Sequence, residues 1–392
     1  MDEFEGVGWF YLFNTHKKTT NRYQTSQPVI KQLKTQKKQV NKIQISVGGS
    51  PGSGNFGLGA STSGNSASTS GDIIFCVSDK RIRLWSVNKS KVKKLKSISA
   101  HSQVVSGILL FKNYFISSSE DKSIKVWDQS TKKCVSVLVK NDSPITCMTI
   151  KQDESKLFFG SADGSIKSVS LESITSNSSN EDPPSVLIPP SGSTISNLHF
   201  VPFSVPQSSN PLSSNCQSQN QQVYAPHQSP LSSPHRNAHS LPILVSSSIE
   251  ESSLKLWNLE KFEYFLSLPG HTDKITSISS NDFIQQIISS SLDGTIKFWS
   301  FPAHTNLDSD SNSFVCLSTI DVKQSITCFD SNNHLLIAGL SNGTVLLFDL
   351  FTHAELRKFE NVIPSSLPVT TIILFDNSFI CSGSKFIKIY QF

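Results

Sequence analysis

Residues 270–300 read GHTDKITSISSNDFIQQIISSSLDGTIKFWS, and this stretch decides the fold. Its end, Lys297 to Ser300, alternates polar and apolar residues, which is typical of a strand with one buried face. The dipeptide Asp293-Gly294 is a tight-turn signal, and a serine-rich apolar segment precedes it. Together these features predict a β-hairpin whose turn lies at Asp293-Gly294.

The same hairpin recurs along the chain at a nearly constant interval. Seven residues take the place of Trp299 in its successive copies: Trp85, Trp127, Val169, Trp257, Trp299, Phe348 and Tyr390. The spacings between them are 42, 42, 88, 42, 49 and 42 residues. The interval of 88 contains the low-complexity residues 204–240, and removing them leaves about one repeat of ordinary length. The pattern therefore predicts seven repeats.

These repeats resemble the WD40 family over about residues 73–392. The resemblance rests on the tryptophans, the dipeptide Trp127-Asp128, the hairpin turns and an upstream histidine in two copies. It implies an all-β, seven-bladed propeller in which each blade buries its faces against its neighbours. It also implies structural roles for the anchors Trp85 and Trp257 and for two buried groups: His101, Asp121 and Trp127 in one repeat, His271, Asp293 and Trp299 in another.

A Ser–His–Asp nucleophile is the catalytic alternative for these two groups. The arrangement recurs at the repeat interval, and the chain has no nucleophile elbow, so the structural role is favoured. We find no metal-ligand constellation, no phosphate-binding loop and no paired carboxylates. We therefore predict no catalytic residue, no metal and no cofactor, and a protein that is not an enzyme.

The N-terminal region is expected to complete the ring. The last anchor lies two residues before Phe392, which leaves the last blade without an outer strand. Residues 9–13 and residues 28–34 are the two candidates for it, and we prefer residues 9–13 because exposed aromatic side chains need shelter. Residues 42–47 alternate and are expected to form the first inner strand. The predicted domains are a basic segment 1–47, a linker 48–72 and the propeller 73–392.

Two segments have compositions that do not support a packed core. Residues 48–72 contain 8 Gly and 7 Ser in 25 positions, which predicts a flexible linker. Residues 204–240 contain 10 Ser, 6 Gln, 5 Pro and 4 Asn, which predicts a disordered insertion. It falls between the inner and second strands of its blade, on the face that also receives the linker.

Composition also limits the cellular setting. The seven cysteines are scattered and form no CxxC pair, which argues against a disulfide scaffold and favours a reducing compartment. We expect no signal peptide, because the first residues are acidic and the apolar patch 9–13 is short, and no transmembrane helix, because no apolar run is long enough. We expect an intracellular protein, cytoplasmic or nuclear or both, that is monomeric by itself.

Two functional classes follow from the expected surfaces. The face with short turns is preorganised for docking, so we expect a non-catalytic scaffold or adaptor that binds proteins or peptides there. Its position-based candidates are Gln103, Glu120, Lys274 and Leu292.

The alternative class is a binder of RNA or anionic phospholipid. Residues 80–119 contain no acidic residue, and Lys91, Lys93, Lys94 and Lys96 lie on the outer strand of the first blade and its loop. With the basic segment 1–47 beside them, they form a candidate phosphate-binding edge. The chain from residue 73 onward has 27 Lys/Arg against 26 Asp/Glu, and aromatic residues are not interleaved with these lysines, so the scaffold is favoured.

Overall fold

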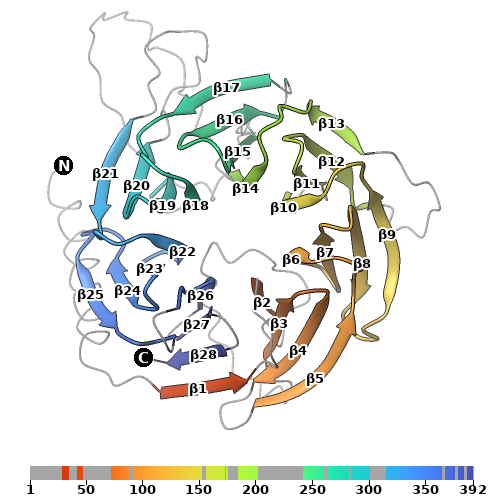
Figure 1. Cartoon of the computed structure of the whole chain (residues 1–392), viewed down its shortest axis with the longest axis horizontal. Coiled ribbons are helices and arrows are strands. Elements are labelled where there is room, and N and C mark those ends of the chain that lie inside the picture. Colours follow the sequence, from red (N-terminus) through yellow and green to blue (C-terminus); the bar gives the residue numbers. More distant parts are fainter. Residues whose placement is uncertain are drawn as a thin grey trace, which may run out of the picture.

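The computed structural model describes residues 29–34, 42–46, 72–87, 92–151, 156–172, 174, 184–201, 242–259, 261, 263–281, 284–300, 315–363, 367–375, 378–383 and 386–391. Within them, the strands form seven four-stranded sheets whose neighbouring strands are all antiparallel. The sheets stand radially around a central axis (Figure 1). The prediction of an all-β propeller is confirmed.

The sheets are numbered here in chain order, and each is given from its innermost to its outermost strand. Sheet 1 contains β2 (Lys42–Ser46), β3 (Asp72–Ser78), β4 (Arg81–Val87) and β5 (Val92–Ser99). Sheet 2 contains β6 (Val105–Phe111), β7 (Tyr114–Ser119), β8 (Ser123–Asp128) and β9 (Cys134–Lys140). Sheet 3 contains β10 (Ile145–Lys151), β11 (Lys156–Ser161), β12 (Ile166–Ser170) and β13 (Ser185–Ile188). Sheet 4 contains β14 (Ile195–Val201), β15 (Ile243–Ser248), β16 (Leu254–Asn258) and β17 (Glu263–Leu268).

The remaining three sheets follow the same order. Sheet 5 contains β18 (Ile275–Asn281), β19 (Gln286–Ser291), β20 (Thr295–Ser300) and β21 (Cys316–Asp321). Sheet 6 contains β22 (Ile326–Ser331), β23 (Leu335–Leu340), β24 (Val345–Asp349) and β25 (Glu355–Phe359). Sheet 7 contains β26 (Thr371–Phe375), β27 (Ser378–Gly383), β28 (Phe386–Gln391) and β1 (Val29–Lys34).

The strand that closes the ring in sheet 7 is β1, and not the preferred residues 9–13. The outer edge of β28 pairs with β1, with Val29 opposite Gln391 and Lys34 opposite Phe386 (Figure 1). The preference for residues 9–13 was therefore wrong, and those residues lie outside the described part of the chain. The physical reason is connectivity: only seven residues separate β1 from β2, so β1 reaches sheet 1 by a short outer-to-inner connection.

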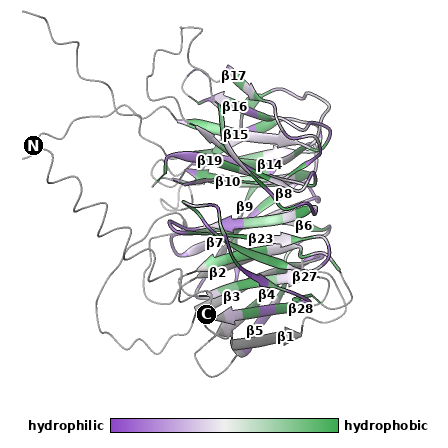
Figure 2. Cartoon of the chain, turned by 90° about the vertical axis from the view of Figure 1, so that its left-hand side faces the viewer, coloured by the Kyte–Doolittle hydropathy of each residue, from purple (hydrophilic) through white to green (hydrophobic). Residues whose placement is uncertain are grey.

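The core lies between adjacent sheets. Phe75 of sheet 1 contacts Phe115 of sheet 2 with ring centroids 5.0 Å apart, and Phe115 stacks on Trp127 at 5.9 Å. Ile82 and Leu84 of β4 belong to this same buried cluster. Figure 2 shows the sheets side by side, with hydrophobic colour along many strands. Each sheet thus buries apolar faces against its neighbours, which explains why one repeat is insufficient for stability.

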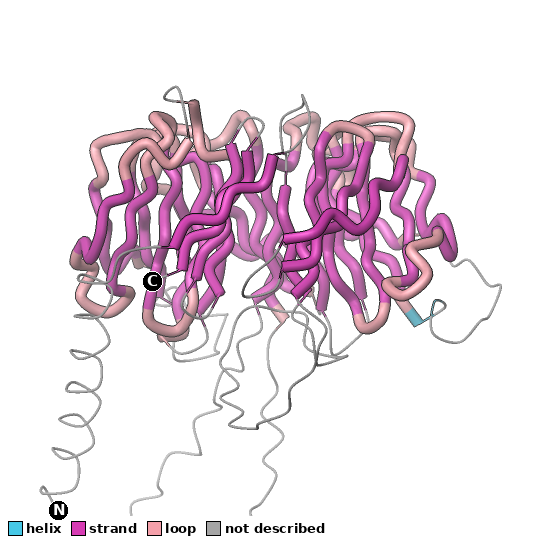
Figure 3. Tube along the Cα trace, turned by 90° about the horizontal axis from the view of Figure 1, so that it is seen from below, coloured by secondary structure: helices cyan, strands magenta, loops and turns pink. Residues whose placement is uncertain are grey.

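The connections divide between two faces (Figure 3). One face carries the turns between second and third strands and the loops that enter the inner strands; we call it the short-loop face. The opposite face carries the other two connections of each sheet. The predicted insertion 204–240 and nearly all of the predicted linker 48–72 lie outside the described residues. The strands that flank the insertion, β14 and β15, end and begin on the opposite face.

Candidate functional site

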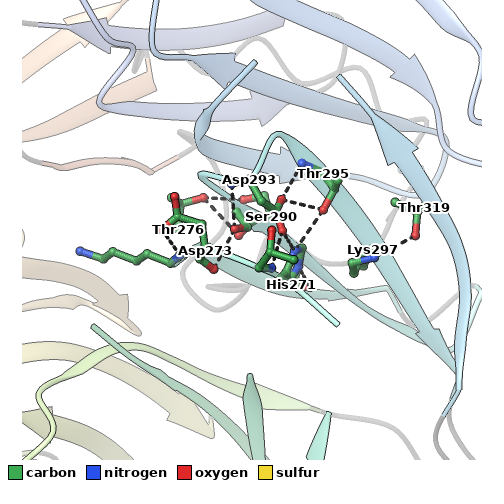
Figure 4. Close-up of polar contacts among 12 residues, drawn as sticks. His271, Asp273, Thr276, Ser290, Asp293, Thr295, Lys297 and Thr319 are labelled. Atoms are coloured by element: carbon green, nitrogen blue, oxygen red, sulfur yellow. Dashed lines mark hydrogen bonds and ion pairs between the residues drawn. The ribbon is translucent and has the colours of Figure 1, made fainter. Parts of the chain in front are cut away.

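Sheet 5 contains a buried hydrogen-bonded group built from β19, β20, the turn between them and the loop before β18 (Figure 4). The His271 Nδ1 atom lies 2.9 Å from Asp293 Oδ2, and His271 Nε2 lies 2.8 Å from Ser289 Oγ. The indole N–H of Trp299 donates to Ser289 Oγ at 2.9 Å. Because a carboxylate only accepts, His271 Nδ1 carries the proton, and Ser289 donates its hydroxyl hydrogen to Nε2.

Sheet 2 repeats this arrangement. His101 Nδ1 lies 2.9 Å from Asp121 Oδ2, His101 Nε2 lies 2.8 Å from Ser117 Oγ, and Trp127 Nε1 donates to Ser117 Oγ at 2.9 Å. Burial lowers the pKa of both histidines, which favours neutral imidazole. Burial alone raises the pKa of Asp121, but hydrogen bonds from Ser123, Ser102 and His101 outweigh it and hold that pKa at about 2.

The geometry gives these groups a structural task. Ser117 and Ser289 are both 0% exposed, so neither hydroxyl can reach a substrate. Each serine oxygen also accepts the indole N–H of its tryptophan, and each group ties an inner-strand loop to the hairpin of its own sheet. A nucleophile would need access and a free oxygen, and these serines have neither.

Around the other two anchor tryptophans, Trp257 and Trp85, the hydrogen-bonded group is incomplete. Trp257 donates to Ser246 Oγ at 2.9 Å in sheet 4. Trp85 is 9% exposed, and its indole nitrogen has no hydrogen-bond partner among the described residues. Register explains this difference, because Cys76 stands opposite Arg83 where Ser117 stands opposite Lys125.

Hydrogen bonds link neighbouring connections of the short-loop face into a rim. Within a sheet, the hairpin turn donates to the loop that enters the inner strand: Glu120 N to Val104 O at 2.9 Å and Leu292 N to Lys274 O at 3.0 Å. Between sheets, the loop donates to the preceding turn, as Asn141 N does to Lys122 O at 2.7 Å. The loops before β6, β10, β14 and β22 are thereby held from both sides, and the loop before β18 is held by the turn that contains Leu292.

The four predicted docking residues all lie on this rim. Gln103 and Glu120 are exposed, whereas Lys274 and Leu292 are partly buried. The sequence analysis missed two apolar side chains on the same face, Ile249 at 46% and Leu367 at 40% exposure. Ile249 follows its strand as Glu120 and Leu292 follow theirs, so the repeat register was the signal that could have identified it.

The predicted basic edge extends farther than the sequence indicated. Lys93, Lys94 and Lys96 are exposed on β5, while Lys91 lies outside the described residues. Lys96 Nζ donates to the backbone carbonyl of Lys132 in the next sheet at 3.3 Å, which brings the β8–β9 turn alongside β5. Burial lowers the pKa of Lys132, and the charge of Lys96 lowers it further, although Asp128 opposes both effects. We call Lys93, Lys94, Lys96, Lys132 and Lys133 the basic surface.

Two ionisable residues on innermost strands were not anticipated. Asp330 Oδ2 accepts the backbone N–H of Leu374 in the next sheet at 2.8 Å, and burial raises the pKa of Asp330 to about 7. His199 Nε2 lies 2.9 Å from Ser280 Oγ of the next sheet, and burial lowers the pKa of His199 to about 4. Both side chains bridge adjacent sheets, so they contribute to the inner seams of the ring.

Neither a metal site nor a membrane span is found in the described part of the chain. No cluster of three or more His, Cys, Asp or Glu side chains is arranged there to hold a metal ion. The same residues include no helix with the length and apolar character needed to cross a membrane.

Comparisons with known proteins agree with the repeat pattern. The family described as "WD domain, G-beta repeat" matches residues 262–300, and the TEP-1 C-terminal beta-propeller matches residues 101–170. WD40 repeats are therefore recognised in this chain at residues 262–300, and the sheets and the tryptophan-centred groups agree with that class of protein.

Individual relatives match only parts of the chain. Nuclear distribution protein nudF of Aspergillus niger is 34% identical over 91 residues, 22% of this chain and 20% of that protein. Pre-mRNA-splicing factor cwf17 of Schizosaccharomyces pombe is 31% identical over 100 residues, 24% of this chain and 28% of that protein. An uncharacterized WD repeat-containing protein of the same yeast is 41% identical over 58 residues, 15% of each chain. The matches thus span less than a third of the length of each of these relatives.

Proposed function

We propose that this protein is a non-catalytic scaffold that docks protein or peptide partners on its short-loop face. The observation that carries the proposal is the hydrogen-bonded rim, in which Glu120, Leu292 and their neighbours are held by hydrogen bonds. A surface that is ordered before binding loses little conformational entropy when a partner docks, so more of the contact energy appears as affinity.

The chemistry of the rim suits a protein partner. Exposed Glu120 and partly buried Lys274 supply charges of opposite sign, and Ile249 and Leu367 supply separate apolar contacts. Protein interfaces combine apolar anchors with a polar surround in this way. Two relatives are named for nuclear distribution and pre-mRNA splicing, and an intracellular site of action agrees with those names.

Affinity purification with mass spectrometry tests the proposal through a charge-reversal pair. Glu120→Lys combined with Lys274→Glu keeps the net charge and alters the short-loop face. Glu355→Lys combined with Lys261→Glu is the matched control, because both residues are exposed beside connections on the opposite face. Proteins captured by the wild type should be retained by the control and lost with the short-loop pair. Equal capture by both pairs would place the docking surface elsewhere.

The second candidate function is binding of RNA or anionic phospholipid by the basic surface. It is favoured by one observation, the meeting of lysines from two adjacent sheets at the Lys96–Lys132 contact. Changing Lys91, Lys93, Lys94 and Lys96 to Gln should weaken such binding for all sequences alike. The slope of log affinity against log salt should fall by about 0.7–0.9 for each lost phosphate contact. Unchanged slope and affinity would eliminate this candidate.

A further inference from the structure

Sheet 1 buries three polar groups that have no hydrogen-bond partner among the described residues. They are Nη1 of Arg83, Nε1 of Trp85 and the hydroxyl of Ser97. Arg83 is only 8% exposed and Trp85 only 9%. Burying a polar N–H group without a hydrogen-bond acceptor is unfavourable, so the unpaired Nη1 atom of Arg83 indicates a missing acceptor.

The three groups share one side of the sheet. Arg83 and Ser97 are directly opposite in the β4–β5 pairing, and Trp85 is two residues beyond Arg83 on β4. Residues that are opposite or two apart project from the same face, with side chains that begin within about 7 Å of one another. Ile82, Leu84 and Ile98 occupy the other face, where they pack against sheet 2. Sheet 7 is the other neighbour of sheet 1 in the ring (Figure 1), so the alternation of side chains along β4 directs the unpaired groups toward sheet 7.

Acidic residues are absent from β4, β5 and the described part of sheet 7, which surround Arg83. Residues 80–119 contain no Asp or Glu, and the described residues of sheet 7 contain none either. Lys94, which is exposed and stands opposite Trp85, adds a second positive charge at the outer end of the same face. All these groups donate hydrogen bonds, and the arginine, tryptophan and lysine side chains cannot accept one.

In sheets 2, 4 and 5 the lysine at this register position has a hydrogen-bond partner. Lys125 Nζ donates to the carbonyl of Ala100 at 2.8 Å, and Lys255 Nζ lies 2.7 Å from Glu251 Oε1. In sheet 5, Lys297 Nζ bonds Thr319 Oγ1 at 3.2 Å, the residue that corresponds to Ser97. Arginine replaces lysine only in sheet 1, and there the equivalent bond is not formed.

We propose that Arg83, Trp85 and Ser97 form an oxyanion site that binds a phosphate group at the seam between sheets 1 and 7. The planar guanidinium group presents paired N–H donors that match phosphate oxygens, and the indole N–H and the serine hydroxyl supply two more. Lys94 stands at the exposed end, where it attracts the anion. The site shares Lys94 with the basic surface but differs from it because the donors of Arg83, Trp85 and Ser97 are buried and receive a single phosphate. It is also independent of docking on the short-loop face.

Isothermal titration of the full chain with inorganic phosphate, in a chloride background of matched ionic strength, tests the site. We expect saturable binding and a thermal stabilisation that grows with phosphate concentration. Trp85→Phe removes one donor and Arg83→Lys removes the paired geometry, and each should weaken binding about tenfold. Both replacements are compatible with the fold, since Phe348 and Lys125 hold the equivalent positions in other sheets.

Three controls make the outcome decisive. Arg81→Lys is the same substitution on an exposed residue of β4 and should leave phosphate affinity unchanged. Ser97→Ala provides a further donor deletion if either larger replacement lowers solubility. A peptide containing phosphoserine, compared with its unphosphorylated form and with inorganic phosphate, distinguishes a protein-borne phosphate from a free one. Absence of saturable binding in the wild type, or equal affinity in wild type and Trp85→Phe, would overturn the proposal.

Discussion

The contribution of the tryptophan-centred groups can be isolated by comparing two identical substitutions. Trp299→Phe and Trp85→Phe each shorten a buried anchor, at 2% and 9% exposure respectively. They differ in one respect: Trp299 Nε1 donates to Ser289 Oγ at 2.9 Å, whereas Trp85 Nε1 has no partner among the described residues. The loss of ring volume is common to both, so the difference in unfolding free energy reports the hydrogen bond.

We expect Trp299→Phe to be more destabilising by about 1 kcal/mol. A net hydrogen bond contributes about 0.5–1.5 kcal/mol. The larger penalty for an unsatisfied group does not apply, because the Ser289 hydroxyl still donates to His271 Nε2 at 2.8 Å. In this stability experiment Trp299→Phe is expected to have the larger effect. In the phosphate titration, by contrast, the substitution at Trp85 is the one that should lower phosphate affinity.

Urea unfolding followed by far-ultraviolet circular dichroism in phosphate-free buffer measures this difference. Circular dichroism is preferred because both substitutions alter tryptophan fluorescence. The comparison requires equal denaturant slopes in the two variants, since a change in slope would indicate a change in unfolding behaviour. If the two variants are equally destabilised, or if Trp85→Phe is the worse, the hydrogen-bonded group does not stabilise sheet 5 as argued.

Trp127→Ala and Trp299→Ala should each cost about 3–5 kcal/mol of unfolding free energy, as large buried truncations do, and urea melts like those of the wild type would contradict the repeat assignment. Deletion of residues 29–34 should expose β28 and cause aggregation in size-exclusion chromatography, whereas deletion of residues 1–14 should leave the chain monomeric. Asp330→Asn should stabilise the protein at pH 8 by about 1–3 kcal/mol and have no effect at pH 4. The folded-state pKa of Asp330 is raised to about 7, so the wild type loses stability as the pH rises from about 4 to about 7. A gain that is the same at both pH values would show that charge burial is not the cause.

The repeat and its local chemistry follow from sequence because they are periodic. Trp127, Asp121 and His101 lie within 27 residues of one another, and the same set returns with Trp299, Asp293 and His271. The hairpin strands alternate, and the turn dipeptide marks their junction. Such signals depend on neighbouring residues and predict the all-β class, whereas the resemblance to WD40 repeats implies the buried groups and the rim positions Gln103 and Glu120.

Contacts between distant parts of the chain were decided by the tertiary structure. Two N-terminal segments were compatible with the edge of β28, and only the pairing of Val29 with Gln391 selects β1. The backbone N–H of Leu374 donates to Asp330 in the preceding sheet, and the sequence of neither strand predicts this hydrogen bond. Arg83 resembles the lysines of its register position, and its isolation is visible only where sheet 1 meets sheet 7. Sequence periodicity determines how each sheet is built, whereas the partners across a seam depend on which two sheets the closed ring brings together.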